Sequence, residues 1–143
     1  MELLIPADVE VASLDEVSML LPDHGFPNIT KAMGTLGTKL PKASPKPAEF
    51  GRLFTTGGTP RDIVTDSPTL VAEGYAEKEQ RARDLCALMI AIIEAAGRSG
   101  TLGAQTVYRA RAISLPTNLP HPQVPTHFRF TAMISVDLRR TTA

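Results

Sequence analysis

The sequence predicts a single α+β domain over residues 1–143, in which one long and one short helix pack on a mainly antiparallel sheet of four to five strands. Three observations predict this class. Residues 127–138 alternate between apolar and polar side chains, which is typical of a strand with one face on a core. Residues 77–97 repeat apolar side chains at helical spacing, and proline-rich segments separate the other apolar runs. A one-sided core favours antiparallel pairing, with the helices packed on one side of the sheet.

A short helix is predicted near the N-terminus, where Ser13 and Glu16 form a capping box. Apolar residues then recur on one helical face: Leu14, Val17, Leu20 and Leu21. Pro22 ends this helix. Residues 29–40 read as a weak strand. Residues 41–47 form a Pro/Lys loop that cannot continue a hydrogen-bonded ladder.

Residues 49–56 and 69–76 predict two strands joined by a long hairpin connection. One face of the second strand consists mostly of small residues: Leu70, Ala72, Gly74 and Ala76. Small side chains let another backbone approach closely, so we expect a helix against this face. Residues 77–97 supply the long helix, with Gly97 as its predicted terminating residue.

Residues 106–114 predict a further strand with Arg109 and Arg111 on one face, followed by an irregular proline-rich excursion at residues 115–126. Together with Arg129 these arginines would form a basic stripe across adjacent strands. The sequence has no Trp and only seven other aromatic rings, Phe and Tyr together, so stacking platforms for nucleic acid are scarce. We therefore expect no sequence-specific nucleic-acid binding.

No catalytic or metal-binding motif is found in the sequence. Residues 57–62, GGTPRD, lack the lysine of a P-loop and lead towards a strand, so their glycines and proline indicate turn geometry. The three histidines, His24, His121 and His127, are not spaced as metal ligands. Cys86 lies in the apolar half of the long helix, where a thiol is usually a small core residue. We expect no enzyme activity, no cofactor and no metal.

Charged residues are sorted along the chain, although the net charge is zero. Residues 1–24 carry six acids and no base, and residues 25–61 carry six bases and one acid. Two interpretations stay open: ordinary solvated faces, or acidic and basic patches that meet between neighbouring subunits. The N-terminus lacks the pattern of a signal peptide and no apolar run is long enough to cross a membrane, so we expect a cytoplasmic protein or one carried in a particle assembled there.

A strand leading into T-x-G-G-x-x-R-D-x-V-T-D-x-P, followed by a strand and a long helix, resembles the tail terminator (tail completion) proteins of long-tailed, siphovirus-type bacteriophages. The matching residues are Thr55, Gly57, Gly58, Arg61, Asp62, Val64, Thr65, Asp66 and Pro68. The C-terminal part is similar to the family's last hairpin, including Asn118, Leu119 and Pro120. The likeness covers residues 49–139. Residues 1–48 correspond only in a looser plan of helix, strand and proline loop.

The resemblance implies a homo-hexameric ring that caps the head-proximal end of a tail tube, stops its growth and offers a docking face for head joining. The implied partners are further copies of the chain, the major tail tube protein and a head–tail connector or stopper protein. The implied location is the neck region of the virion tail, after assembly in the host cytoplasm. Two other functions stay open, namely another neck connector component and, less closely, a cytoplasmic domain for a small ligand.

The predicted assembly interface consists of Arg61, Asp62 and Asp66 at the hairpin tip, with Arg52 nearby. A closed ring joins unlike faces of neighbouring subunits, and long connections on a compact sheet can reach such a neighbour. The alternative is that Asp62 and Asp66 only hydrogen-bond the backbone of their own turn.

Overall fold

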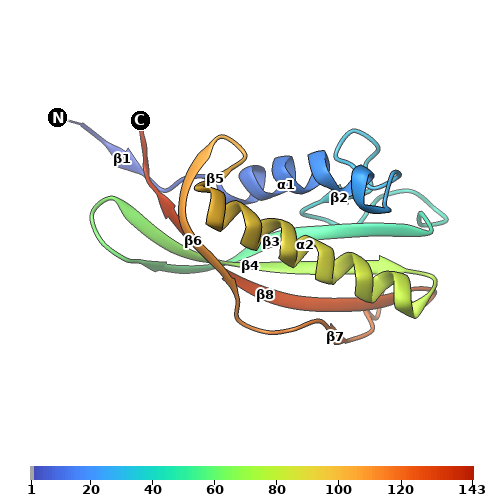
Figure 1. Cartoon of the computed structure of the whole chain (residues 1–143). Coiled ribbons are helices and arrows are strands. Elements are labelled where there is room, and N and C mark those ends of the chain that lie inside the picture. The colour runs from blue at the N-terminus through green and yellow to red at the C-terminus, as the bar shows by residue number, and fades with distance from the viewer. Residues whose placement is uncertain (1) are drawn as a thin grey trace.

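Four long strands form the centre of the sheet, in the spatial order β3 (Glu49–Pro60), β4 (Thr65–Ala76), β8 (Phe128–Arg139) and β6 (Gln105–Ala112). Each pairs antiparallel with its neighbour. Figure 1 shows this curled sheet in the computed structural model of the protein, which describes residues 2–143. The predicted α+β class and the mainly antiparallel sheet are confirmed.

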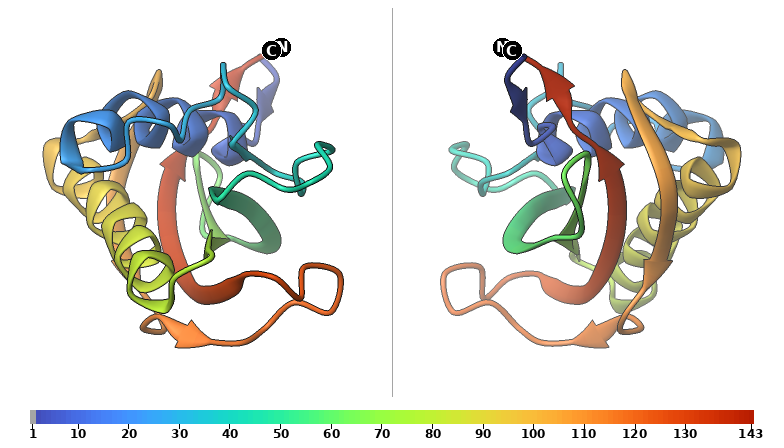
Figure 2. Two further views of the ribbon diagram at one scale, coloured as in Figure 1. Left: turned by 90° about the vertical axis from the view of Figure 1, so that its right-hand side faces the viewer. Right: turned by 90° about the vertical axis from the view of Figure 1, so that its left-hand side faces the viewer.

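Three two-residue strands extend this sheet to seven strands: β2 (Leu36–Gly37) beside β3, β5 (Thr101–Leu102) beside β6, and β7 (Thr117–Asn118) beside β8. A separate pair, β1 (Leu4–Ile5) and β9 (Thr141–Thr142), brings the two ends of the chain together (Figure 2). The predicted count of four to five strands was too low, because a two-residue strand leaves no alternation in the sequence.

Two helices, α1 (Val9–Leu20) and α2 (Glu79–Ser99), cover one face of the sheet (Figure 2). Helix α2 packs closely on β4 because the residues beneath it are small. A Cβ atom added at Gly74 would lie 2.7 Å from the carbonyl oxygen of Ala82 and 2.8 Å from the backbone nitrogen of Cys86. The prediction that a helix packs against the small-residue face of β4 is therefore confirmed.

Helix α1 begins earlier than predicted and has a different cap. Asp8 is the N-cap, and its Oδ1 accepts a hydrogen bond from the Val11 amide at 3.1 Å. Ser13 lies buried within the helix, where its hydroxyl donates to the carbonyl of Glu10 at 3.1 Å. The capping box with Glu16 was wrong, because the apolar residues one turn before Ser13 are also buried and extend the helix.

The segment between α1 and β3 is mostly irregular. Helix α1 runs into a 3-10 turn, η1 (Leu21–His24), which begins beside Pro22. The strand predicted at residues 29–40 was wrong except for β2, because side-chain hydrogen bonds organise the segment into turns. The Thr35 hydroxyl donates to the carbonyl of Asn28 at 2.7 Å and accepts from the Thr30 amide at 3.0 Å.

Helix α2 also runs further than predicted. Gly100, with a φ of 94°, is its left-handed C-cap. Gly97 lies inside the helix, where an added Cβ would come within 2.6 Å of the backbone nitrogen of Ala110 on β6. The missing side chain at Gly97 therefore allows close packing against β6. The prediction that Gly97 ends the helix was wrong.

The opposite face of the sheet carries a second, smaller core. Phe50 and Tyr75 stack with their ring centroids 4.5 Å apart, and Val124 and Leu40 pack against them. The proline-rich segment that precedes β8 thus covers this face, with only β7 regular within it. As a result, the second half of β4 is buried on both faces.

The alternation predicted for residues 127–138 is confirmed along β8, where Phe130, Ala132, Ile134, Val136 and Leu138 are all buried. Two positions differ. Phe128 at the start of the strand is 38% exposed, and His127, predicted on the polar face, is buried with its Nε2 2.7 Å from the carbonyl oxygen of Pro47.

The close contact at Gly74 yields the first prediction. A Gly74→Ala substitution forces α2 away from β4 and should lower the free energy of unfolding by about 1–3 kcal/mol, the usual cost of overpacking. Urea denaturation measures this loss. Gly37→Ala is the matched control, since no atom lies within 4 Å of its added Cβ. Equal stability of the two variants would show that the contact is not tight.

Candidate functional site

The conspicuous surface feature of the protein is an arm, which we define as residues 57–68. The arm joins β3 to β4, which stay paired from Gly58 opposite Pro68 to Pro60 opposite Asp66. A register shift between Thr55 and Gly58 marks its base. Figure 1 shows the arm extending past the end of α2. The stretch predicted as a long connection is therefore mostly strand, with a tight turn at residues 61–64.

The two glycines at the base of the arm have the positive φ angles that the sequence predicted for them. Gly57 and Gly58 have φ values of 99° and 125°, a conformation open mainly to glycine. An added Cβ at Gly58 would also lie 2.3 Å from the carbonyl oxygen of Ser67. The positive φ angles are confirmed, but both glycines lie at the register shift within β3 and not in a turn.

Asp62 closes the turn at the tip of the arm. Its Oδ1 accepts hydrogen bonds from the amides of Val64 at 2.9 Å and Thr65 at 2.8 Å. The hydrogen bond from the Val64 amide is the main cause that lowers the pKa of the Asp62 carboxyl. Asp62 thus bonds the backbone of its own turn, which was the alternative to an interface role.

Two ion pairs fasten the arm to the C-terminal part of the chain. Arg61 Nη1 lies 2.9 Å from Asp137 Oδ2 on β8, and the Ser67 hydroxyl donates to Asp137 Oδ1 at 2.6 Å. Asp66 accepts from Nε and Nη2 of Arg140, the latter at 2.8 Å. The partner of Asp66 is therefore a distant side chain and not its own turn. Backbone pairing adds to these ties, because Thr65 and Asp66 stand opposite Arg139 and Leu138 of β8, so the arm is more than an isolated two-stranded ribbon.

The turn points an apolar side chain into solvent. Ile63 is 83% exposed, and its neighbour Val64 is partly exposed. Glycine, proline and short polar residues dominate turns, so a β-branched Ile at the tip is unusual. Ile63 was not part of the predicted interface, because that prediction rested on the charged residues of this stretch.

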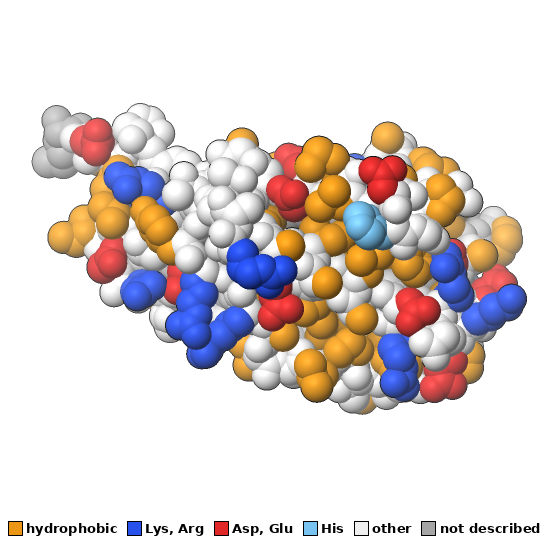
Figure 3. All heavy atoms as spheres, viewed as in Figure 1, with side chains coloured by type: hydrophobic (Ala, Val, Ile, Leu, Met, Phe, Trp, Pro, Cys, Tyr) orange, Lys and Arg blue, Asp and Glu red, His pale blue; other side chains and the backbone are white. Residues whose placement is uncertain are grey.

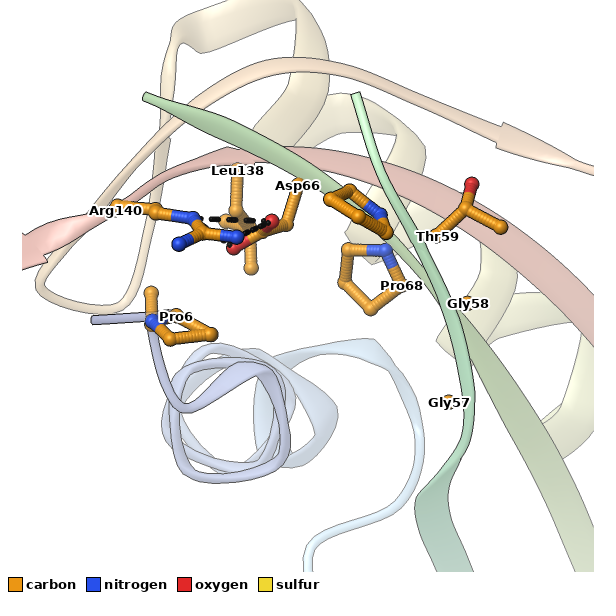
Figure 4. Close-up of a pocket in the computed structure, with 10 residues that line it drawn as sticks. Pro6, Gly57, Gly58, Thr59, Asp66, Pro68, Leu138 and Arg140 are labelled. Carbon is orange, nitrogen blue, oxygen red and sulfur yellow. Dashed lines mark hydrogen bonds and ion pairs between the residues drawn. The ribbon is translucent and has the colours of Figure 1, made fainter. Parts of the chain in front are cut away.

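A pocket of about 240 Å³ lies between the arm and the segment that precedes α1 (Figure 4). We call it the arm pocket; it is lined by Pro6, Ala7, Gly57, Gly58, Thr59, Pro60, Asp66, Pro68, Leu138 and Arg140. Most of this lining is apolar, and its two charged groups, Asp66 and Arg140, bind one another. Its volume falls below the roughly 300–1,000 Å³ of typical small-molecule sites.

Arg52 does not lie near the arm tip, contrary to the sequence-based expectation. It stands opposite Glu73 in the middle of the sheet, and its Nη1 lies 3.0 Å from Glu73 Oε1. Arg129 Nη1 lies 3.0 Å from Glu73 Oε2, and the Tyr75 hydroxyl donates to Glu73 at 2.8 Å. Glu73 is only 3% exposed. The sequence did contain a signal for this cluster, because Glu73 is the one acid among the mostly small and apolar residues 69–76.

The Glu73 cluster ties two loops to the sheet. Arg52 donates to the carbonyl of Thr38, and Arg129 donates to the carbonyl of Leu119. Burial raises the pKa of the Tyr75 hydroxyl to about 12, so this hydroxyl stays protonated as a donor. The cluster is therefore a structural support for the loops on this face.

The predicted basic stripe is interrupted, because Arg129 belongs to the Glu73 cluster. Arg109 and Arg111 on β6 stay exposed, and Figure 3 shows Lys and Arg side chains gathered over β6 and the arm. Several acids of the N-terminal segment bind within the chain: Asp8, Glu10, Asp15 and Glu16. The segment still carries no base.

Groups for catalysis are not gathered at the arm. Burial raises the pKa of the Cys86 thiol to about 12, as expected for a core cysteine. Within residues 2–143, no group of three or more His, Cys, Asp or Glu residues is placed to hold a metal ion. Over the same residues, no helix has the length and apolar character required to span a membrane. No protein-family model and no curated protein matches the chain.

The Glu73 cluster yields the second prediction. Glu73→Ala leaves two arginines without their buried partner and should lower the free energy of unfolding by about 3 kcal/mol. Tyr75→Phe removes one hydrogen bond and should cost about 1 kcal/mol. Chemical denaturation compares the two variants. If both variants lost only about 1 kcal/mol of unfolding free energy, Glu73 would not be the residue that organises this face.

The third prediction concerns Asp62. Its pKa in the folded protein should lie below the ordinary value of 3.8, since the Val64 amide stabilises the charged form. The turn should then persist as the pH falls to 3.8 and lose its closing bonds only below that pH. Carboxyl NMR titration measures the midpoint, together with the amide shifts of Val64 and Thr65. A midpoint at or above 3.8 would refute the closing role.

Proposed function

We propose that the chain is a structural subunit that caps the head-proximal end of a phage tail tube as a homo-hexameric ring, stops tube polymerisation and allows head joining. The observation that carries the proposal is the arm. The stretch with the tail-terminator-like pattern forms an ordered projection whose tip offers Ile63 and Arg61 to a partner. A projection suited to a macromolecular contact is what a ring subunit needs.

The shape of the arm further supports an assembly role. Its charged groups act largely within the chain: Asp62 closes the turn, Asp66 pairs with Arg140, and Arg61 pairs with Asp137 on β8. These bonds fix the direction in which the tip points. A contact element that is already ordered loses less conformational entropy on assembly, which favours a stable ring.

Another neck connector component is the nearer alternative, and a cytoplasmic domain for a small ligand is the more distant one. The arm pocket is smaller than typical ligand sites, and its only ion pair is satisfied internally. The arm pocket therefore suits a protein–protein contact better than a small ligand.

The fourth prediction is the phenotype of particles made without this protein. Electron microscopy of particles from a phage with the gene disrupted should show overlong tubes detached from DNA-filled heads, because nothing stops tube growth. Restoring the gene in trans is the control and should return tube length to normal. Tails of normal length that fail to join heads would assign the chain to the connector. Intact infectious virions would refute an essential assembly role.

A further inference from the structure

The face of the sheet opposite α1 and α2 (Figure 2) carries four arginines close to the arm. We call this part of the sheet the arginine face and define it by Arg61, Arg109, Arg111 and Arg139. Arg109 on β6 stands opposite Asp137 of β8, and Arg111 stands opposite Ser135. Side chains of opposite residues share one face of a sheet. Arg139 is two residues from Asp137 on β8 and therefore shares that face as well. Arg61 reaches it from the arm, with its Nη1 2.9 Å from Asp137 Oδ2.

The carboxylates near the arginine face are already bound within the chain. Asp137 holds Arg61 and also accepts from the Ser67 hydroxyl at 2.6 Å. Asp62 accepts the amides of its own turn, and Asp66 pairs with Arg140. The three other arginines of this face are exposed and form no salt bridge within residues 2–143: Arg109, Arg111 and Arg139. The face therefore keeps an excess of positive charge.

Hydroxyl groups lie among these arginines. Ser135 of β8 stands between Thr69 of β4 and Arg111 of β6, and both hydroxyl side chains are half-buried. Arginine and hydroxyl side chains are the groups that commonly contact phosphate oxygens, whereas the centre of a protein interface is rich in apolar side chains. The chemistry of the arginine face thus favours phosphate as its ligand.

The extent of the arginine face favours a polymer over a small anion. Arg109 and Arg111 lie two residues apart on one strand, a separation of roughly 7 Å. Arg139 and Arg61 come from two other elements, β8 and the arm. A single phosphate can bond only one or two guanidinium groups. A nucleic acid strand carries a phosphate about every 3.4 Å along the helix axis, so it offers several phosphates to a surface of this extent.

We propose that the arginine face binds the phosphate backbone of a nucleic acid without reading its sequence. The guanidinium groups donate to phosphate oxygens, and the hydroxyls of Thr69 and Ser135 add further donors. The chain has no Trp and few other aromatic rings, so stacking on bases contributes little. The inference rests on the side chains of this chain and not on the proposed function.

The salt dependence of DNA binding tests the proposal. A short fluorescein-labelled DNA duplex is titrated with the full chain, and binding is followed by fluorescence anisotropy. With four phosphate contacts, the affinity should fall about a hundredfold between about 50 and 200 mM NaCl, because each contact releases bound counterions. A second duplex of unrelated sequence should bind with the same affinity.

Two double variants separate a local surface from net charge. Arg109→Gln with Arg111→Gln removes two of the four contacts, so the loss over the same salt range should shrink to about tenfold. Lys39→Gln with Lys42→Gln is the matched control, because both lysines are exposed, lie in the segment before β3 and carry the same total charge. The control should bind the duplex as the unsubstituted chain does.

Asp137 provides a change of the opposite sign. Asp137→Asn removes a negative charge from the arginine face and releases Arg61, while its amide oxygen can still accept from Ser67. This variant should bind the duplex several-fold more tightly. The inference is overturned if the chain does not bind the duplex, or if the arginine variant and its lysine control show the same salt dependence. Competition by poly-L-glutamate as strong as by unlabelled duplex would also overturn it, in favour of an acidic protein partner.

These results are separable from the test of the proposed function. A chain that does not bind DNA, together with overlong tubes in the gene disruption, would overturn the role of the arginine face and leave the terminator proposal standing. DNA binding through the arginine face, together with normal tails in the disruption, would support the inference and remove the terminator proposal.

Discussion

The burial of β4 on both faces is the constraint on which the rest of the structure depends. Gly74 and the small residues on one face admit the backbone of α2. On the other face, Glu73 and Tyr75 lie beneath the loops that precede β3 and β8. Because the strand is held from both sides, its N-terminal end can continue outward as the arm. There it keeps its register with β8, with Asp66 opposite Leu138, and shifts its register against β3.

Charge acts differently at the two ends of β4. Glu73 is buried, and such a carboxylate is tolerated only when its partners satisfy it, as two arginines and a tyrosine do here. Asp66 pairs with Arg140 in a partly exposed setting at the arm. The buried cluster sets the position of the loops, while the outer pair sets the direction of the arm.

Much of the fold could be predicted from local patterns. The alternation of residues 127–138 and the small face of residues 69–76 both follow from burial. Burial of one face produces a regular spacing of apolar or small residues, which can be seen in the sequence. Helix limits were less predictable, because competing signals lie within one turn of each other. Asp8, and not Ser13, caps α1, and the packing of Gly97 against Ala110 overrides its usual role as a terminator.

The candidate site was only partly predictable for a different reason. The local bonds of Asp62 follow from its place in a turn, so they could be anticipated. The pairs Asp66–Arg140 and Arg61–Asp137 join residues more than 70 positions apart, which a single sequence does not reveal. Arg52 was placed near the tip because it is near in sequence, although its side chain lies in the Glu73 cluster.

In the proposed ring, a preformed arm of each copy joins it to the next copy at the end of a tail tube. Electron cryo-microscopy of the neck of intact particles tests this claim most directly. We expect six copies of this fold in one closed ring at the head-proximal end of the tube, with each arm against the next subunit. Copies absent from that position, or present there with their arms free in solvent, would contradict it.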